Sequence, residues 1–108
     1  MPWQIEYYSE KVKKQVSSLP AGILADYLHI VKLCEEFGAN LGMPHSKALS
    51  GGLFEFRPKG KEGIARVLYC TMIGKRVVVL HCFVKKTQQA PSKELALARR
   101  RMAEVKNG

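Results

Sequence analysis

The first residues of the chain alternate between apolar and polar, and the pattern then changes to helical spacing. Trp3, Ile5 and Tyr7 are separated by single polar residues, which predicts a β-strand over residues 3–8. Ser9 follows directly and is a typical helix cap, and the apolar residues after it lie three or four positions apart. We therefore expect a strand that leads at once into a helix.

A second, longer helix is predicted to start at Pro20, a residue suited to a first helical turn. Apolar residues recur every three or four positions from Ile23 to Phe37, and they form a wide stripe that is typical of a helix buried on one side. Gly38 is a plausible C-terminal cap. Residues 39–52 are rich in Gly, Ser and Pro, so we expect a loop there.

The second half of the chain returns to strand-like patterns. Three segments are rich in β-branched, aromatic or alternating residues, which predicts strands over 53–57, 64–72 and 76–84. The connections between them are short, and the turn at 73–75 predicts a hairpin. Helical spacing resumes after Pro91 and predicts a C-terminal helix.

These elements predict a single α+β domain over residues 1–108. We expect an N-terminal strand and two helices, a three-stranded antiparallel meander joined to the first strand in one antiparallel sheet, and a C-terminal helix. A chain of 108 residues can bury one core, and the apolar run Val77–Leu80 suits a central strand covered on both faces. We see no membrane span and no secretory signal, so we expect a cytoplasmic protein with no membrane partner.

The cysteines favour a reduced protein without a metal site. Cys34, Cys70 and Cys82 are odd in number, and their spacing fits no zinc pattern. His81 and Cys82 are adjacent, but neighbouring residues of a strand point to opposite faces. We therefore interpret the three cysteines as small core residues and expect no metal and no cofactor.

Positive charge is concentrated in one part of the chain. Residues 57–93 contain nine Lys or Arg and a single acid, Glu62, whereas the rest of the chain has nine basic and eight acidic residues. The net charge of +9 therefore belongs almost entirely to the predicted meander and its loops. A cationic sheet of this kind indicates a polyanionic partner, for which nucleic acid is the strongest candidate.

Four basic residues lie on or beside predicted strands, where strand pairing can gather them: Arg57, Arg66, Lys85 and Lys86. Neighbouring strands are about 4.8 Å apart, so three of them can bring these side chains within reach of one nucleotide. Lys59 and Lys61 on the intervening loop are placed to flank the same site. Edge protection and solubility are the simpler interpretation of any one of these charges.

Such a group could assist RNA cleavage by the ribose 2′-hydroxyl. Arginine suits the stabilisation of phosphate charge, and lysine donates a proton if neighbouring cations lower its pKa. His81, His45, Glu55 and Tyr69 are the candidates for proton transfer. Core packing is the competing interpretation for His81 and Tyr69, and Glu55 is either a base or the ion-pair partner of Arg57.

Several segments resemble the RelE/HigB superfamily of toxins, and most closely its phage-derived toxin-like branch. The segments are LFEFR (53–57), KEGIARVLY (61–69), VVVLHCFVKKTQQAP (77–91) and ALARRRM (96–102). The resemblance implies a small toxin of a type II toxin–antitoxin pair, which enters the ribosome and cleaves mRNA without a metal. It also implies a cognate antitoxin, typically a helix-turn-helix protein, and contact with DNA only through the antitoxin complex.

The resemblance assigns roles by position. Arg57 matches the arginine of an E-L-R strand, Arg66 that of a G-x-x-R-V strand, and Lys85 and Lys86 an F-x-K-K pair, so these four are the expected catalytic residues. Further contacts with mRNA or ribosomal RNA are expected from Lys59, Lys61, Tyr69, Arg99 and Arg100. Arg101 is considered together with Arg99 and Arg100, and a solvated helix face is the equal alternative for these three arginines. Two alternatives stay open: a non-catalytic module that binds RNA, and a module that only binds an acidic, antitoxin-like partner.

Overall fold

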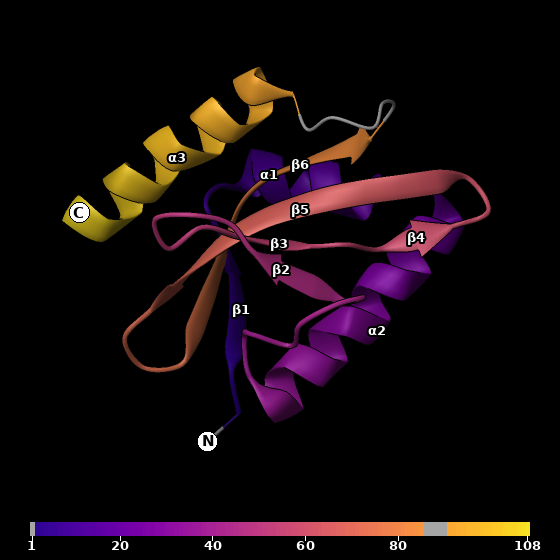
Figure 1. The fold of residues 1–108 in the computed structure, drawn as a ribbon, viewed down its shortest axis with the longest axis horizontal. Coiled ribbons are helices and arrows are strands. Elements are labelled where there is room, and N and C mark those ends of the chain that lie inside the picture. Colours follow the sequence, from indigo (N-terminus) through magenta and orange to yellow (C-terminus); the bar gives the residue numbers. More distant parts are fainter. Residues whose placement is uncertain (1, 86–90) are drawn as a thin grey trace.

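The computed structural model describes residues 2–85 and 91–108 of the chain (Figure 1). The elements in chain order are β1 (Gln4–Tyr7), α1 (Glu10–Ser17), α2 (Ala21–Phe37), β2 (Ser46–Ala48), β3 (Phe54–Phe56), β4 (Lys59–Gly60), β5 (Gly63–Met72), β6 (Arg76–Lys85) and α3 (Ser92–Asn107). The α+β architecture is therefore the predicted one, with two helices before the meander and one after it.

The strands form one sheet in the order β1-β6-β5-β3-β2, and β4 pairs with β5 beside β3. The meander β3-β5-β6 is antiparallel, as predicted. The prediction of a wholly antiparallel sheet is wrong, because β1 runs parallel to β6 with Gln4 beside Arg76 and Tyr7 beside Val79. Alternation of apolar residues reports which face a side chain takes, and it carries no information about strand direction.

The helices cover the two faces of the sheet. One core cluster joins α1 and α2 to β3, β5 and β6, and it includes Val12, Ile30, Phe56, Val67 and Val79. The second cluster joins α3 to the opposite face through Leu68, Cys70, Val78, Leu80 and Ala98. In Figure 1, α1 passes behind β5 and β6, whereas α3 lies apart from it at upper left. The run Val77–Leu80 is buried on both faces, which confirms its prediction as a central, doubly covered strand.

Local signals explain where several elements begin and end. The Ser9 hydroxyl accepts a hydrogen bond from the Val12 N–H (3.2 Å) and caps α1 as predicted. Gly38 ends α2 at a φ of +101°, a conformation that favours glycine. The β5–β6 hairpin turns at residues 73–75, where Gly74 has a φ of +92°. None of the helices in the described ranges is both long and apolar enough to cross a membrane.

Two segments that were predicted as loops contain short strands. β2 lies within residues 39–52 and pairs with β3, and β4 lies within residues 58–63 and pairs with β5. Both are only two or three residues long, so they have too few positions for a periodic pattern to stand out from the surrounding Gly, Ser and Pro.

The β4–β5 hairpin is fastened to the first turns of α2. Glu62 accepts a hydrogen bond from the Gly22 N–H (2.9 Å), and this bond is the main reason why the pKa of Glu62 lies below its usual value. Asp26 accepts a second hydrogen bond from the Lys59 N–H (2.8 Å). At Gly60 the two backbones meet so closely that a β-carbon would lie 2.6 Å from the Gly22 carbonyl carbon. The hairpin is therefore a docked element rather than the flexible loop expected from its charge.

Replacing Gly60 with alanine is expected to destabilise the protein by about 1–3 kcal/mol, because a fixed backbone must move to admit the methyl group. Gly22→Ala is the comparison: its β-carbon would meet only the end of the Glu62 side chain, which can move aside at the cost of its exposed hydrogen bond to the Gly22 N–H, so a smaller loss is expected. Denaturant unfolding of the two variants measures the difference. Equal stability of Gly60→Ala and the wild type would show that the two backbones are not in close contact.

All three cysteines are buried and free, as predicted. Burial raises the pKa of the Cys34 and Cys82 thiols from an ordinary value of 9.0 to about 11, and it raises that of Cys70 as well. Between pH 9 and pH 11 the unfolded chain therefore loses thiol protons that the folded chain keeps, so the free energy of unfolding falls as the pH rises through this window.

Native protein at pH 8 is expected to react with iodoacetamide far more slowly than protein unfolded in guanidinium chloride, because the reagent needs an accessible thiolate. Mass spectrometry of the alkylated chain counts the modified thiols. Rapid alkylation of Cys34 or Cys82 in the native protein would contradict their burial.

Candidate functional site

The face of the sheet that carries α3 also carries most of the predicted site residues. Arg66 lies between Ala65 and Val67, which both point toward α1 and α2, so its own side chain points to the α3 face. The same alternation places Glu55 on the α3 face. The strand pairing puts Phe83 beside Arg66, and Lys85 lies two residues further along β6 beside Ile64.

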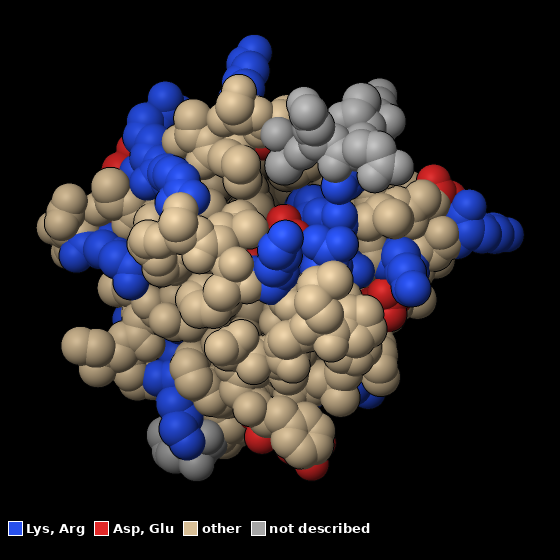
Figure 2. Space-filling model, viewed as in Figure 1, with Lys and Arg blue, Asp and Glu red and all other residues tan. Residues whose placement is uncertain are grey.

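The resulting surface is a small grid of side chains on adjacent strands. Arg57 follows β3 directly and lies next to Arg66, because the pairing of Phe56 with Val67 continues by one step. Lys59 on β4 is paired with Ile64 on β5. We call the group Arg57, Lys59, Arg66 and Lys85 the basic sheet face. Figure 2 shows lysine and arginine side chains grouped near the centre of this view, with mainly uncharged surface below them.

Glu55 holds the two arginines of the basic sheet face together. Its Oε2 atom lies 2.6 Å from Arg57 Nη1 and 3.4 Å from Arg66 Nε. Glu55 and Arg66 are 5% and 3% exposed, so their charges are almost fully withdrawn from water. Of the two interpretations left open for Glu55, the structure shows the ion pair, with Arg66 as a second partner that the sequence did not indicate.

Arg66 carries a buried charge, and neighbouring groups partly offset the free-energy cost of removing that charge from water. Burial lowers the pKa of its guanidinium, the Glu55 carboxylate raises it, and the cation of Arg57 lowers it again. Because arginine keeps its proton in proteins, this guanidinium stays charged and requires a counterion. Arg66 Nη1 also donates to the Ala65 carbonyl at 3.1 Å, which fixes the side chain against the sheet.

The predicted lysines within the described residues differ in their exposure and in their position on the sheet. Lys59 is exposed and Lys85 is half-buried, both on the α3 face, and Lys61 is exposed at the tip of the β4–β5 hairpin. Lys86, the fourth expected catalytic residue, lies outside the described residues. The structure thus brings Arg57, Arg66, Lys59 and Lys85 to one face and places Lys61 at its margin.

His81 is on the same face, but its ring is occupied by the fold. Its Nε2 atom lies 2.7 Å from Glu94 Oε2 at the start of α3, and its Nδ1 atom is buried and has no hydrogen-bond partner among the described residues. The ring stands 6.0 Å from that of Phe83. The contact between His81 and Glu94 therefore links β6 to the first turn of α3, beside the basic sheet face.

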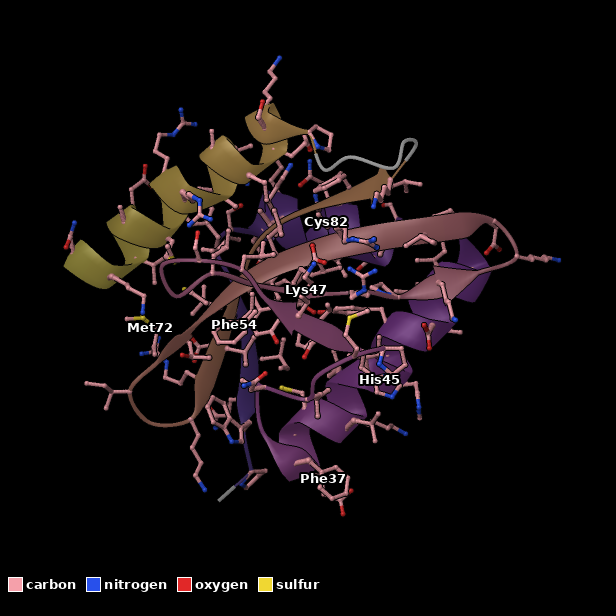
Figure 3. All side chains as sticks on the ribbon, viewed as in Figure 1. Phe37, His45, Lys47, Phe54, Met72 and Cys82 are labelled. Carbon is pink, nitrogen blue, oxygen red and sulfur yellow. The ribbon has the colours of Figure 1, made fainter. Side chains whose placement is uncertain are left out.

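Tyr69 was expected among the RNA-binding residues, but the structure places its side chain in the core. It is fully buried, its ring stacks on Phe56 with a centroid distance of 4.0 Å, and its hydroxyl donates to the Ala39 carbonyl at 2.5 Å. Burial also raises the pKa of this phenol well above the range of proton transfer at neutral pH. The His45 carbonyl accepts a hydrogen bond from the Arg57 N–H (2.9 Å), and its ring lies beside that of His29 of α2. Figure 3 labels His45.

The three arginines of α3 point in different directions, as their helical spacing predicted. Arg99 donates to the Ser50 carbonyl (2.8 Å) and hydroxyl (3.0 Å) in the β2–β3 loop. Arg101 donates to the Leu80 carbonyl (2.8 Å) and lies over the Tyr8 ring. Arg100 is exposed beside Lys93 and Leu97 on the surface of the helix. Arg99 and Arg101 thus have structural contacts that the prediction of RNA binding did not include.

Lys47 is a basic residue of this surface that the sequence did not reveal. It is exposed on β2 and paired with Glu55, which places it on the α3 face (Figure 3). Residues 39–52 were predicted as a loop, so the side-chain direction of Lys47 could not be inferred. The alternation of Ser46, Lys47 and Ala48 was the available signal, but three residues are too few to decide.

The arrangement is suited to binding a phosphodiester. Arg57 keeps about a quarter of its side chain exposed, at 23%, so its guanidinium can donate hydrogen bonds to a phosphate oxygen, and the neighbouring cation of Arg66 adds positive charge beside it. Lys59 and Lys85 add charge on neighbouring strands. In the described part of the chain, no group of three or more His, Cys, Asp or Glu residues could hold a metal ion.

Comparisons with known proteins give the family from one match and the fold from another. Residues 14–103 match the family model described as phage-derived protein Gp49-like. A chain from the crystal structure of the archaeal RelE–RelB complex of Pyrococcus horikoshii OT3 is 19% identical, with a TM-score of 0.57. The match covers 80% of this chain and 98% of the archaeal chain, which shows a RelE-like fold. No curated protein matches the chain significantly.

Proposed function

Because this chain belongs to the family of phage-derived Gp49-like proteins and has a RelE-like fold, we propose that it is the toxin of a type II toxin–antitoxin pair. The proposed activity is endonucleolytic cleavage of mRNA at the ribosome, which stops translation. The observation that carries this proposal is the pair of arginines held on one Glu55 oxygen at the centre of the basic sheet face.

The proposed reaction is attack by a ribose 2′-oxygen on the adjacent phosphorus. The P–O5′ bond breaks, the 2′-hydroxyl loses its proton, and the leaving 5′-oxygen gains one, which yields a 2′,3′-cyclic phosphate and a 5′-hydroxyl. Arg57 and Arg66 would stabilise the negative charge on the phosphate oxygens, so that the protein's own cations supply the charge without a metal. Lys85 and Lys86 would position the RNA or transfer a proton.

The partners follow from the same proposal. The basic charge of residues 57–93 suits mRNA and ribosomal RNA, with Lys59, Lys61 and Arg100 as outer contacts. The archaeal structure is a complex of RelE with RelB, and by analogy we expect a protein antitoxin, of the helix-turn-helix type in this family, that blocks the basic sheet face. DNA would be reached only through that complex.

A non-catalytic RNA-binding module is the second candidate, and a specific observation favours it. Within the described residues of the basic sheet face, Arg66 is 3% exposed, and His81 beside it is tied to Glu94. The candidate acid–base residues His81 and Glu55 are thus held in ion pairs, and a site without a free acid–base residue can bind a phosphate without cleaving it. Both candidates use the same surface, and they differ only in the fate of the RNA.

Inducible expression in a bacterium tests the toxin proposal. The wild type is expected to halt growth and the incorporation of labelled methionine within one generation, and the variant Arg57→Ala, in which Glu55 keeps Arg66 as its ion-pair partner, is expected to accumulate without arrest. Continued growth while folded wild type accumulates would refute the proposal. Arrest by both proteins would show that the basic sheet face is not the active element.

A further inference from the structure

Lys47 lies at the edge of the sheet, next to the basic sheet face. β2 is the last strand beside β3, and the pairing of Lys47 with Glu55 aims the lysine to the same face as Arg57 and Arg66. Its neighbour Ser46 is fully buried on the opposite side, which confirms this direction. Figure 3 labels Lys47 near the middle of the molecule, beside β2 and below β5.

The charge of Lys47 is available for a ligand. Glu55 is its in-register neighbour, but the Oε2 atom of this carboxylate is shared by Arg57 and Arg66. Lys47 is also exposed, whereas Glu55 is buried. An exposed lysine beside a neutralised carboxylate adds positive potential to the surface, and its flexible stem allows the ammonium to reach a phosphate.

A three-residue edge strand would fray if it were held by strand pairing alone, but β2 is fixed at its far end. The Leu49 N–H donates to the Leu53 carbonyl at 2.8 Å, which closes the β2–β3 hairpin. The guanidinium of Arg99 donates hydrogen bonds to Ser50 in the same hairpin and so connects the hairpin to α3. Lys47 is therefore carried by a supported element, so that less order has to be gained when it binds.

The cations form an oblique line across four strands, from Lys47 on β2 through Arg57 and Arg66 to Lys85 on β6. Three strand spacings of about 4.8 Å give this line a width of about 14 Å measured across the strands, and the shift along the strands makes the line itself longer, so it has room for more than one nucleotide. Along the strands the surface is closed at one end, because α3 packs on Leu68 and Leu80.

We propose that Lys47 binds an RNA phosphate and that single-stranded RNA crosses the sheet from β2 to β6, rather than running along the strands. This inference rests on the proposed function, since it extends the same surface. It adds a contact outside the residues that the family resemblance assigns, and it gives the direction in which the substrate lies.

The salt dependence of RNA binding tests this inference with a readout separate from cleavage. Fluorescence anisotropy would measure the affinity of purified wild type, Lys47→Ala and Lys32→Ala for a labelled single-stranded RNA whose 2′-hydroxyls are methylated to prevent cleavage. Lys32 is also an exposed lysine, and it lies on α2, a helix of the opposite face. Loss of one phosphate contact should reduce the slope of log K against log salt by about 0.7 in Lys47→Ala, with no change in Lys32→Ala.

The outcomes separate this inference from the proposed function. A wild type that does not bind RNA at low salt would refute RNA as the ligand of the basic sheet face. A wild type that binds, together with an unchanged slope in Lys47→Ala, would leave the proposed function standing and overturn the role of Lys47. An equal loss of slope in both lysine variants would also overturn it, because the contact would then be general surface charge.

Discussion

Replacing Arg57 with alanine is expected to lower the rate of mRNA cleavage by about 10²–10³-fold, which corresponds to roughly 2.7–4 kcal/mol of lost transition-state stabilisation. Arg57 is the more exposed of the two arginines on Glu55, so it is the one that can reach a phosphate oxygen directly. The fold should survive, because Glu55 keeps Arg66 as its partner in the variant.

The measurement is the cleavage rate of a reporter mRNA in a translating extract at equal protein concentrations. Arg76→Ala is the matched control. Arg76 is also an arginine of the sheet in an ion pair, with Glu6 of β1, and it lies at the end of β6 that is far from Lys85. Arg57→Lys should recover only part of the rate, because lysine keeps the charge but lacks the planar fork. A rate for Arg57→Ala within twofold of the wild type would remove Arg57 from the reaction.

Replacing Glu55 with alanine is expected to destabilise the protein by about 3–5 kcal/mol, the largest loss we expect from a change at the site. Glu55 is the counterion of a buried arginine, and its removal leaves the Arg66 guanidinium charged and unpaired at 3% exposure. A domain of this size has only about 5–15 kcal/mol of stability, so its melting temperature should fall by more than about 10 °C.

Glu6→Ala is the comparison for this prediction. Glu6 also pairs with an arginine, but its side chain is 37% exposed, so its loss should have a much smaller effect on thermal unfolding. The double variant Glu55→Ala, Arg66→Met should recover part of the stability lost in Glu55→Ala, because it removes the unpaired charge as well. If Glu55→Ala unfolds at the wild-type temperature, Glu55 is not the counterion that stabilises the two arginines.

Much of the fold was predictable because its signals are local. The alternation of Trp3, Ile5 and Tyr7, the helix cap at Ser9 and the glycine at position 38 each report on a few neighbouring residues. The parallel pairing of β1 with β6 was not predictable in this way, since it joins residues more than 70 positions apart. The strand β2 was missed because Gly, Ser and Pro surround its three residues.

The candidate site was predicted in outline and not in its internal contacts. Strand alternation was enough to place Glu55 and Arg57 on one face. The sharing of one Glu55 oxygen with Arg66 depends on the register of β3 against β5, which the docked β4 hairpin helps to fix. Tyr69 and Arg99 were predicted to bind RNA, but their polar groups form hydrogen bonds with residues distant in sequence, Ala39 and Ser50, which local patterns do not reveal.

The most direct test of the account is to map the 5′ ends of a reporter mRNA in a translating extract that contains the purified protein. We predict new ends within the translated codons in the presence of the wild type or the Arg76→Ala control, loss of these ends with Arg57→Ala, and an uncut message when ribosomes are left out. An intact message in the presence of folded, RNA-binding wild type would contradict the account and identify the protein as a binding module.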